Sequence, residues 1–128
     1  MTERVELRID GLAEPISHYT DAVRAGSLLF VSGCIGVDGD GNLVPGGVVE
    51  QTRRVVESLG LVLAAAGAGF GDGVKVTVFL TDVDDRVAVN TVRREAFGST
   101  RPASTLVEVS RLAVPGALVE IEAVALIP

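Results

Sequence analysis

The stretch LVEIEAVAL, Leu118–Leu126, alternates between two kinds of side chain, and this alternation predicts a β-strand whose neighbouring residues face opposite sides of a sheet. One set is wholly apolar and suits a covering layer of helices: Val119, Ile121, Ala123 and Ala125. The other set mixes apolar side chains with two carboxylates: Leu118, Glu120, Glu122, Val124 and Leu126. That second face is too apolar for water and too charged for a dry core, so it predicts a subunit interface containing a polar cleft.

Other segments with apolar runs or alternation predict the remaining strands. They are Val5–Ile9, which we expect at a sheet edge, Leu28–Gly33, Val74–Thr81 and Ser104–Val109. The turn-rich DGDGN at Asp38–Asn42 favours a hairpin directly after the Leu28–Gly33 strand, because Asp-Gly pairs suit tight turns.

Two segments have helical spacing. From Val48 the apolar residues recur every three to four positions until about Gly67, and Gly60 within this helix predicts close packing against the sheet. The Asp82–Asp85 turn predicts the cap of a second helix over Arg86–Phe97. The order β-β-β-α-β-α-β-β predicts one α+β domain over 1–128, a sandwich of one mainly antiparallel sheet with two helices on one face.

Composition narrows the function classes. The formal net charge of −6 and the lack of a basic cluster make a nucleic-acid or membrane-surface partner improbable. One cysteine and one histidine cannot form an internal disulfide or a structural zinc site. The charged N-terminus and the absence of a long apolar run predict a cytoplasmic protein.

Several blocks carry a family resemblance in order and spacing: SHYTDAVRAGSLLFVSG at 17–33, AAAGAGFGDGVKVTVFLTDVDD at 64–85, VN at 89–90, PASTLVEVSRL at 102–112 and GALVEIEAVA at 116–125. Over nearly its whole length the chain resembles the RidA/YjgF (reactive intermediate deaminase) family. The resemblance implies a chorismate-mutase-like fold and a homotrimer with three intersubunit clefts. It also implies a small-molecule metabolite as the ligand, with no cofactor and no metal.

The active branch of that family hydrolyses enamines and imines, 2-aminoacrylate among them, to a keto acid and ammonia, and an arginine in a P-A-R motif holds the substrate carboxylate. Here Pro102 and Ala103 match the motif but Ser104 stands at the arginine position. One neutral hydroxyl replaces a charged fork, so we expect 2-aminoacrylate turnover to be weaker by at least about two orders of magnitude. Arg101, near the bend at Pro102, is the favoured replacement, ahead of Arg93, Arg94 and Arg111.

The resemblance also implies roles for other residues. Glu120 matches a glutamate that positions a water, and Tyr19 and Asn90 match polar residues of the cleft. At three further positions the chain departs from the usual family residues and changes the predicted pocket: Cys34 in place of glutamine, Leu106 in place of a small residue or cysteine, and Gly36 in place of proline.

Several of these residues could have purely structural roles instead. Glu120 is either catalytic or a carboxylate that ties one subunit to the next, and Asn90 binds either ligand or backbone. Cys34 is more typical of a small buried residue than of a nucleophile, and His18 of a solvated loop residue.

Two function classes therefore remain. The first is an enamine or imine deaminase that uses Glu120 and a water, with Ser104 and Asn90 as polar donors. The second is a non-catalytic trimer that binds a metabolite or a partner in the same cleft. A ribonuclease activity, sometimes attributed to this family, would need a basic groove that the sequence lacks.

Overall fold

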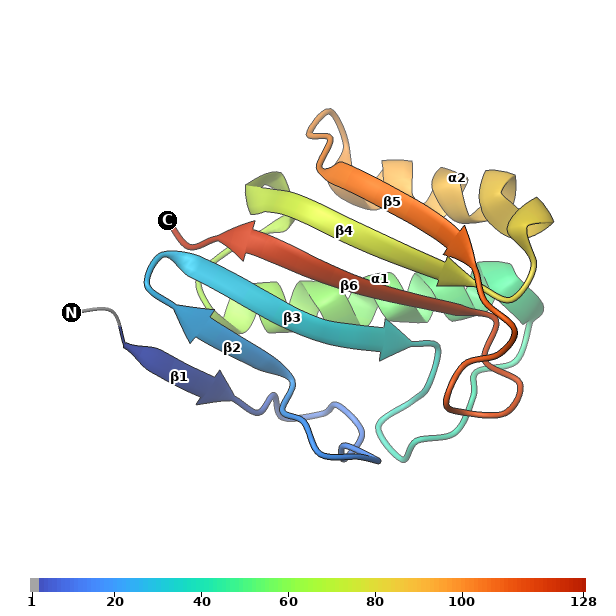
Figure 1. Cartoon of the computed structure of the whole chain (residues 1–128), viewed down its shortest axis with the longest axis horizontal. Coiled ribbons are helices and arrows are strands. Elements are labelled where there is room, and N and C mark those ends of the chain that lie inside the picture. Colours follow the sequence, from blue (N-terminus) through green and yellow to red (C-terminus); the bar gives the residue numbers. More distant parts are fainter. Residues whose placement is uncertain (1–2) are drawn as a thin grey trace.

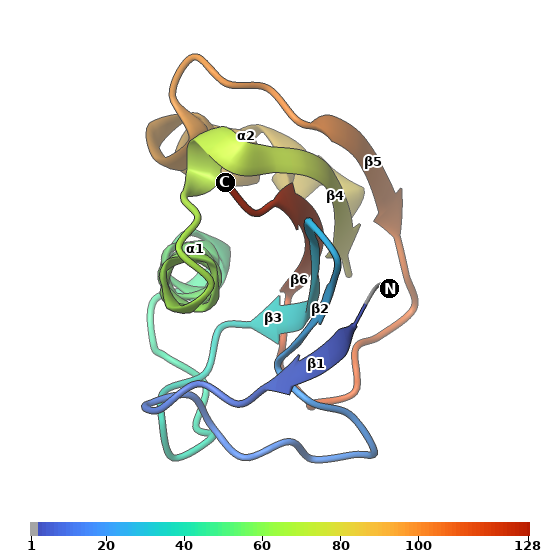
Figure 2. The same ribbon diagram turned by 90° about the vertical axis from the view of Figure 1, so that its left-hand side faces the viewer.

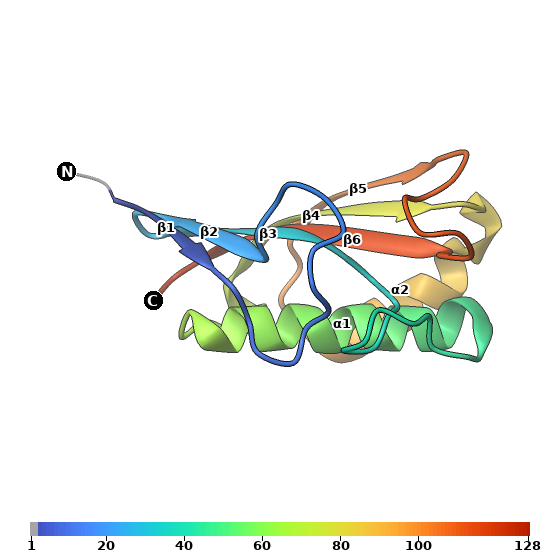
Figure 3. The same cartoon turned by 90° about the horizontal axis from the view of Figure 1, so that it is seen from below.

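The computed structural model describes residues 3–128 (Figure 1). Its elements are β1 (Arg4–Leu7), β2 (Ala22–Ala25), β3 (Leu28–Ile35), α1 (Gly47–Ala65), η1 (Phe70–Asp72), β4 (Gly73–Leu80), η2 (Val83–Asp85), α2 (Arg86–Phe97), β5 (Ala103–Glu108) and β6 (Val119–Leu126). The six strands form one sheet in the order β1-β2-β3-β6-β4-β5, antiparallel except for the parallel pair β4–β5. Both helices cover the same face (Figure 3), which confirms the predicted α+β sandwich.

Strand β6 lies at the centre of the sheet, and its alternation decides which face is covered. Its four small and branched apolar residues are buried under the helices: Val119, Ile121, Ala123 and Ala125. Helix α1 packs its own apolar stripe on β3 and β6, and Val55, Leu59 and Val62 are fully buried there. Among residues 3–128 no helix covers the opposite face of the sheet (Figure 2), and the side chains of β6 that point to this face are half-buried or exposed.

The turn predicted at Asp38–Asn42 is present, and the Asp38 N–H donates to the Asn42 carbonyl over 2.8 Å, but no second strand of regular length directly follows it. The tight turn of a regular hairpin lies at Gly26–Ser27, where Gly26 adopts a positive φ of 62°, and it joins β3 to β2, a strand that the sequence analysis missed. At the predicted turn, the Asp38 side chain also accepts hydrogen bonds from the backbone N–H groups of Asp40 and Asn42. That loop is closed by a single bridge between Val37 and Leu43 rather than by a ladder.

Gly60 contacts an aromatic ring and not the sheet. A Cβ at Gly60 would lie 3.4 Å from the Phe70 ring, which itself packs edge-to-face on Phe97 with ring centroids 5.1 Å apart. The predicted Asp82–Asp85 turn is present directly before α2, and its capping residue is Asp82. The Asp82 side chain accepts the Asp84 N–H in η2, and this turn leads into α2.

An irregularity in β3 prepares the candidate site. Both Val31 and Cys34 pair with helix-facing residues of β6, because the register shifts by one residue between them. This β-bulge places Ser32 and Gly33 outside the regular alternation, at the border of the open face. In residues 3–128 no helix combines the length and the apolar character needed to cross a membrane.

Candidate functional site

A cavity of about 360 Å³ lies on the open side of the sheet, where β6 meets the bulge of β3 and two loops. It is lined by Ile16, Ser17, Tyr19, Ser32, Gly33, Ile35, Ala113, Val114, Glu120 and Glu122. Its polar groups are mainly carboxylates and hydroxyls, and its walls are aliphatic. A small polar molecule held between apolar walls suits such a lining.

Glu120 is the central charged group of this cavity. Its side chain passes so close to the bulge that a Cβ at Gly33 would lie 2.5 Å from Oε2 of Glu120. Gly33 therefore has a structural role that its sequence pattern did not indicate. Because it lacks a side chain, it leaves room for the Glu120 carboxylate in this position.

Burial raises the pKa of Glu120, and the nearby Glu122 carboxylate raises it further. Within residues 3–128 the structure shows no hydrogen-bond donor on the Glu120 carboxylate. A half-buried carboxylate with a raised pKa and no hydrogen-bond donor from the described chain is a stronger base than an ordinary glutamate, which suits it to accept and return a proton in general acid–base catalysis.

Tyr19 borders the same cavity from the loop that precedes β2, and its side chain is 47% exposed. Two hydrogen bonds fix that loop to β3: Ser32 Oγ donates to the Thr20 carbonyl over 2.6 Å, and the Ser32 N–H donates to the Asp21 carbonyl over 3.0 Å. Asp21 is itself held by the Ile9 N–H and by Arg8. His18 is exposed and does not border this cavity.

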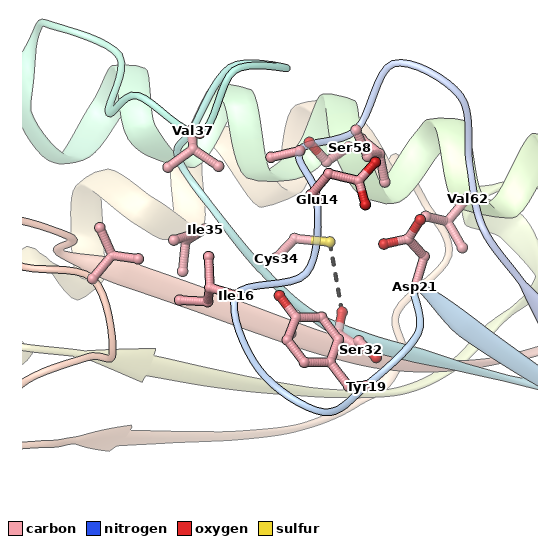
Figure 4. A pocket seen from close by; sticks show the side chains of 15 residues that line it. Glu14, Ile16, Tyr19, Asp21, Ser32, Cys34, Ile35, Val37, Ser58 and Val62 are labelled. Carbon is pink, nitrogen blue, oxygen red and sulfur yellow. Dashed lines mark hydrogen bonds between the residues drawn. The ribbon is translucent and has the colours of Figure 1, made fainter.

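Cys34 points away from the Glu120 cavity, toward α1. Figure 4 shows its thiol surrounded by the labelled side chains of a second cavity, with Glu14 and Asp21 nearby. Burial raises the pKa of Cys34 to about 12, with further contributions from Asp21 and Glu120. At that pKa the sulfur stays a thiol at neutral pH, which agrees with the expectation of a small buried residue rather than a nucleophile.

A second polar cluster lies between α2 and β5. Arg93 donates from Nη1 to Asn90 Oδ1 over 3.0 Å and from Nη2 to Ser104 Oγ over 2.8 Å. The arginine that contacts Ser104 is therefore Arg93 and not Arg101. Arg101 precedes β5, is exposed, and shares with Arg93 the lining of a cavity of about 240 Å³. Leu106 packs against the hydrophobic core.

The two clusters face opposite sides of the sheet within one chain. Ser104 pairs with Val76, which is buried under the helices, whereas Glu120 pairs with Phe79 and faces the open side. A single chain therefore unites Glu120 with Tyr19, and separately Ser104 with Asn90, but it does not bring these pairs together.

One positioning residue escaped the sequence analysis. Gln51 of α1 is almost fully buried, and its amide donates to the Gly116 carbonyl and accepts the Leu118 N–H over 3.1 and 2.8 Å. It holds the loop that carries Ala113 and Val114 at the rim of the Glu120 cavity. A glutamine within a helical stripe was its only sequence signal. Among residues 3–128 no group of three or more potential metal ligands comes together.

Comparisons with known proteins agree with this geometry. Residues 11–127 match the family model described as endoribonuclease L-PSP. A RutC family protein of Pyrococcus abyssi is 44% identical over 113 residues, covering 88% of each chain. The 2-iminobutanoate/2-iminopropanoate deaminase of Capra hircus is 42% identical over 111 residues, covering 86% of this chain and 80% of the deaminase. The structure of Escherichia coli TdcF with bound serine superposes with a TM-score of 0.85 at 33% identity, covering 94% of this chain and 98% of that one.

Proposed function

Because the chain belongs to the RidA/YjgF family, which the endoribonuclease L-PSP model describes, we propose that it hydrolyses small enamines or imines to keto compounds and ammonia. The observation that carries this proposal is Glu120, a half-buried carboxylate of raised pKa with free lone pairs in a cavity of small-molecule size. The activity named for the caprine relative, a 2-iminobutanoate/2-iminopropanoate deaminase, is of the same type.

Glu120 would act as a general base and then as a general acid. It accepts a proton from a water whose oxygen adds to the imine carbon, and it passes this proton to nitrogen, which gives a carbinolamine. It then takes the hydroxyl proton of the carbinolamine and delivers it to nitrogen, so that the carbonyl forms as the carbon–nitrogen bond breaks and ammonia leaves. An enamine is first protonated on carbon and loses a proton from nitrogen to give the imine. One general acid–base group accelerates a reaction by roughly 10²- to 10⁴-fold, which is useful for a substrate that already hydrolyses readily in water.

Assembly would complete the site. Glu120 and Ser104 face opposite sides of one sheet, so a pocket that uses both needs a second copy of the chain. The open face supplies a reason to associate, because Phe30 and Leu126 are large apolar side chains exposed there. We propose a homotrimer whose clefts combine the Glu120 cavity of one subunit with the Ser104 cluster of its neighbour.

The serine at position 104 bears on the choice of substrate. Escherichia coli TdcF binds serine, so a carboxylate-bearing ligand suits this family. Ser104 provides one neutral donor in place of a charged fork, and we therefore propose weak turnover of 2-aminoacrylate. The Arg93 guanidinium at Ser104 reduces the expected deficit to about tenfold to a hundredfold, since a cation is present but already donates to two neutral acceptors.

The test is a coupled assay in which a pyridoxal-phosphate dehydratase generates 2-iminobutanoate in the presence of the protein, and release of 2-oxobutanoate is followed. The wild type should accelerate release, and Glu120→Gln should abolish most of that acceleration. Glu57→Gln, which removes an exposed carboxylate from α1, is the matched control and should behave as wild type. A wild type that binds 2-oxobutanoate but leaves release at the uncatalysed rate would overturn the proposal in favour of a non-catalytic metabolite-binding trimer.

A further inference from the structure

The Arg93 side chain is a partly buried cation whose partners are all neutral. Two of its five N–H groups donate to Asn90 Oδ1 and Ser104 Oγ. Its Nε is buried without a hydrogen-bond partner, which is the one such side-chain atom among residues 3–128. Two hydrogens on the terminal nitrogens remain for another acceptor.

No carboxylate of the described chain compensates this charge. The ion pairs within residues 3–128 involve Arg4, Arg8, Arg53 and Arg54, and none involves Arg93. Burial lowers the pKa of Arg93, as expected for a cation that has lost water without gaining an anion. An uncompensated, partly buried charge is costly, and a bound anion would remove that cost.

The cavity beside Arg93 has an unusual charge for this chain. Three arginines line it, Arg93, Arg94 and Arg101, together with Asn90, Phe97 and Pro102, and no aspartate or glutamate does. The chain as a whole carries a net charge of −6, so a cavity with arginines alone departs from the general balance. Its volume of about 240 Å³ equals roughly eight waters at ~30 Å³ each, which suits an acid of a few carbon atoms.

We propose that Arg93 is the carboxylate-binding residue of the site and provides from helix α2 the positive charge that strand β5 lacks at Ser104. Asn90 and Ser104 are positioning residues, because their oxygens hold the guanidinium between helix and strand. The ligand class is a small 2-keto or 2-imino acid. This inference rests on the proposed function, and it names the group that recognises the substrate.

Binding of 2-oxobutanoate and of its uncharged amide, measured by calorimetry, tests the inference without catalysis. Arg93→Gln should weaken binding of the acid at least about tenfold, the loss expected for one hydrogen bond to a charged group, and should leave binding of the amide unchanged. Arg93→Lys should retain part of the affinity. The matched control is Arg86→Gln, which removes the same charge from an exposed side chain at the start of α2 and should bind the acid as wild type does.

A second measurement covers the case in which Arg93→Gln does not fold. In the ¹⁵N-labelled wild type, the Arg93 side-chain resonance should shift on addition of the acid and not of the amide. An unshifted resonance, or a folded Arg93→Gln protein that binds the acid like wild type, overturns the inference.

The assays also separate the inference from the proposed function. Acid binding that depends on Arg93, in a protein without imine hydrolysis, keeps the inference and refutes the function. If Arg93→Gln hydrolyses imines at the wild-type rate, the proposed function stands and the inference is refuted. A wild type that neither hydrolyses imines nor binds the acid refutes both.

Discussion

The Nη2 atom of Arg93 lies 2.8 Å from Oγ of Ser104, and this hydrogen bond joins helix α2 to the edge strand β5. Ser104, which the family resemblance places at the position of a substrate-binding arginine, thus has a guanidinium in direct contact. Helix α2 therefore provides a positive charge beside position 104, and Ser104 is its hydrogen-bond acceptor.

Turnover of 2-aminoacrylate is the first quantity to measure. In a coupled assay we expect a kcat/KM about tenfold to a hundredfold below that of an arginine-bearing family member, because Ser104 contributes no charge-assisted hydrogen bond. Ser104→Arg alone should not restore the rate, since its guanidinium would meet the one already there. Equal efficiencies of the wild type and the relative would show that Ser104 carries no cost.

The pH dependence of stability should reveal Glu120. Burial and Glu122 raise the pKa of Glu120 in the folded state. The protonated Glu120 side chain therefore contributes to the free energy of unfolding below the ordinary glutamate pKa of 4.5, and this contribution is lost as the pH rises through the raised pKa of the folded state. As the pH rises from acid to neutral, the melting temperature of Glu120→Gln should therefore rise relative to that of wild type. The control is Asp10→Asn, which removes an exposed carboxylate. A difference between Glu120→Gln and wild type that does not change with pH would contradict this assignment.

Assembly can be tested on the open face. Leu126→Glu places a charge on a side chain that is 49% exposed on this face, and we expect light scattering to show a trimer for wild type and smaller species for this variant. Leu61→Glu changes a side chain that is 41% exposed on α1 and should remain trimeric. A monomeric wild type at micromolar concentration would remove both the trimer and the intersubunit cleft.

Substitution of Gly33 should lower imine hydrolysis, as substitution of Glu120 should. In Gly33→Ala the new methyl group would lie 2.5 Å from Glu120 Oε2, so the carboxylate must move and imine hydrolysis should fall at least about tenfold. Gly69→Ala adds the same methyl group where no atom lies within 4 Å, and its activity should match wild type. Full activity of Gly33→Ala would mean that the position of Glu120 is unimportant.

The Cys34 thiol should be unreactive in the native protein. With a pKa of about 12, fewer than about 1 in 10,000 molecules carry the thiolate at pH 7.5, so an aromatic disulfide reagent should react with it only after unfolding. Cys34→Ala should keep kcat/KM within about twofold of wild type. Rapid labelling of the native protein, or loss of turnover in this variant, would reassign the residue.

The sequence by itself determined the faces of the sheet and the positions of the helices. The alternation of Leu118–Leu126 distinguished the covered from the open face, and helical spacing located Arg86–Phe97 with the bounds that the structure shows. Periodicity succeeds here because the solvent exposure of each residue follows the repeat of its own element.

Only the tertiary structure decided the partners of the side chains. The hydrogen bond between Arg93 and Ser104 depends on how α2 lies on β5, and the contact of Gly60 with Phe70 depends on the turn that follows α1. The bulge at Val31–Cys34 turned Cys34 toward the helices and brought Gly33 beside Glu120, although a local pattern gives no sign of one extra residue. Such contacts are set by the packing of distant elements, so the sequence provided the candidate residues and the fold selected which of them meet.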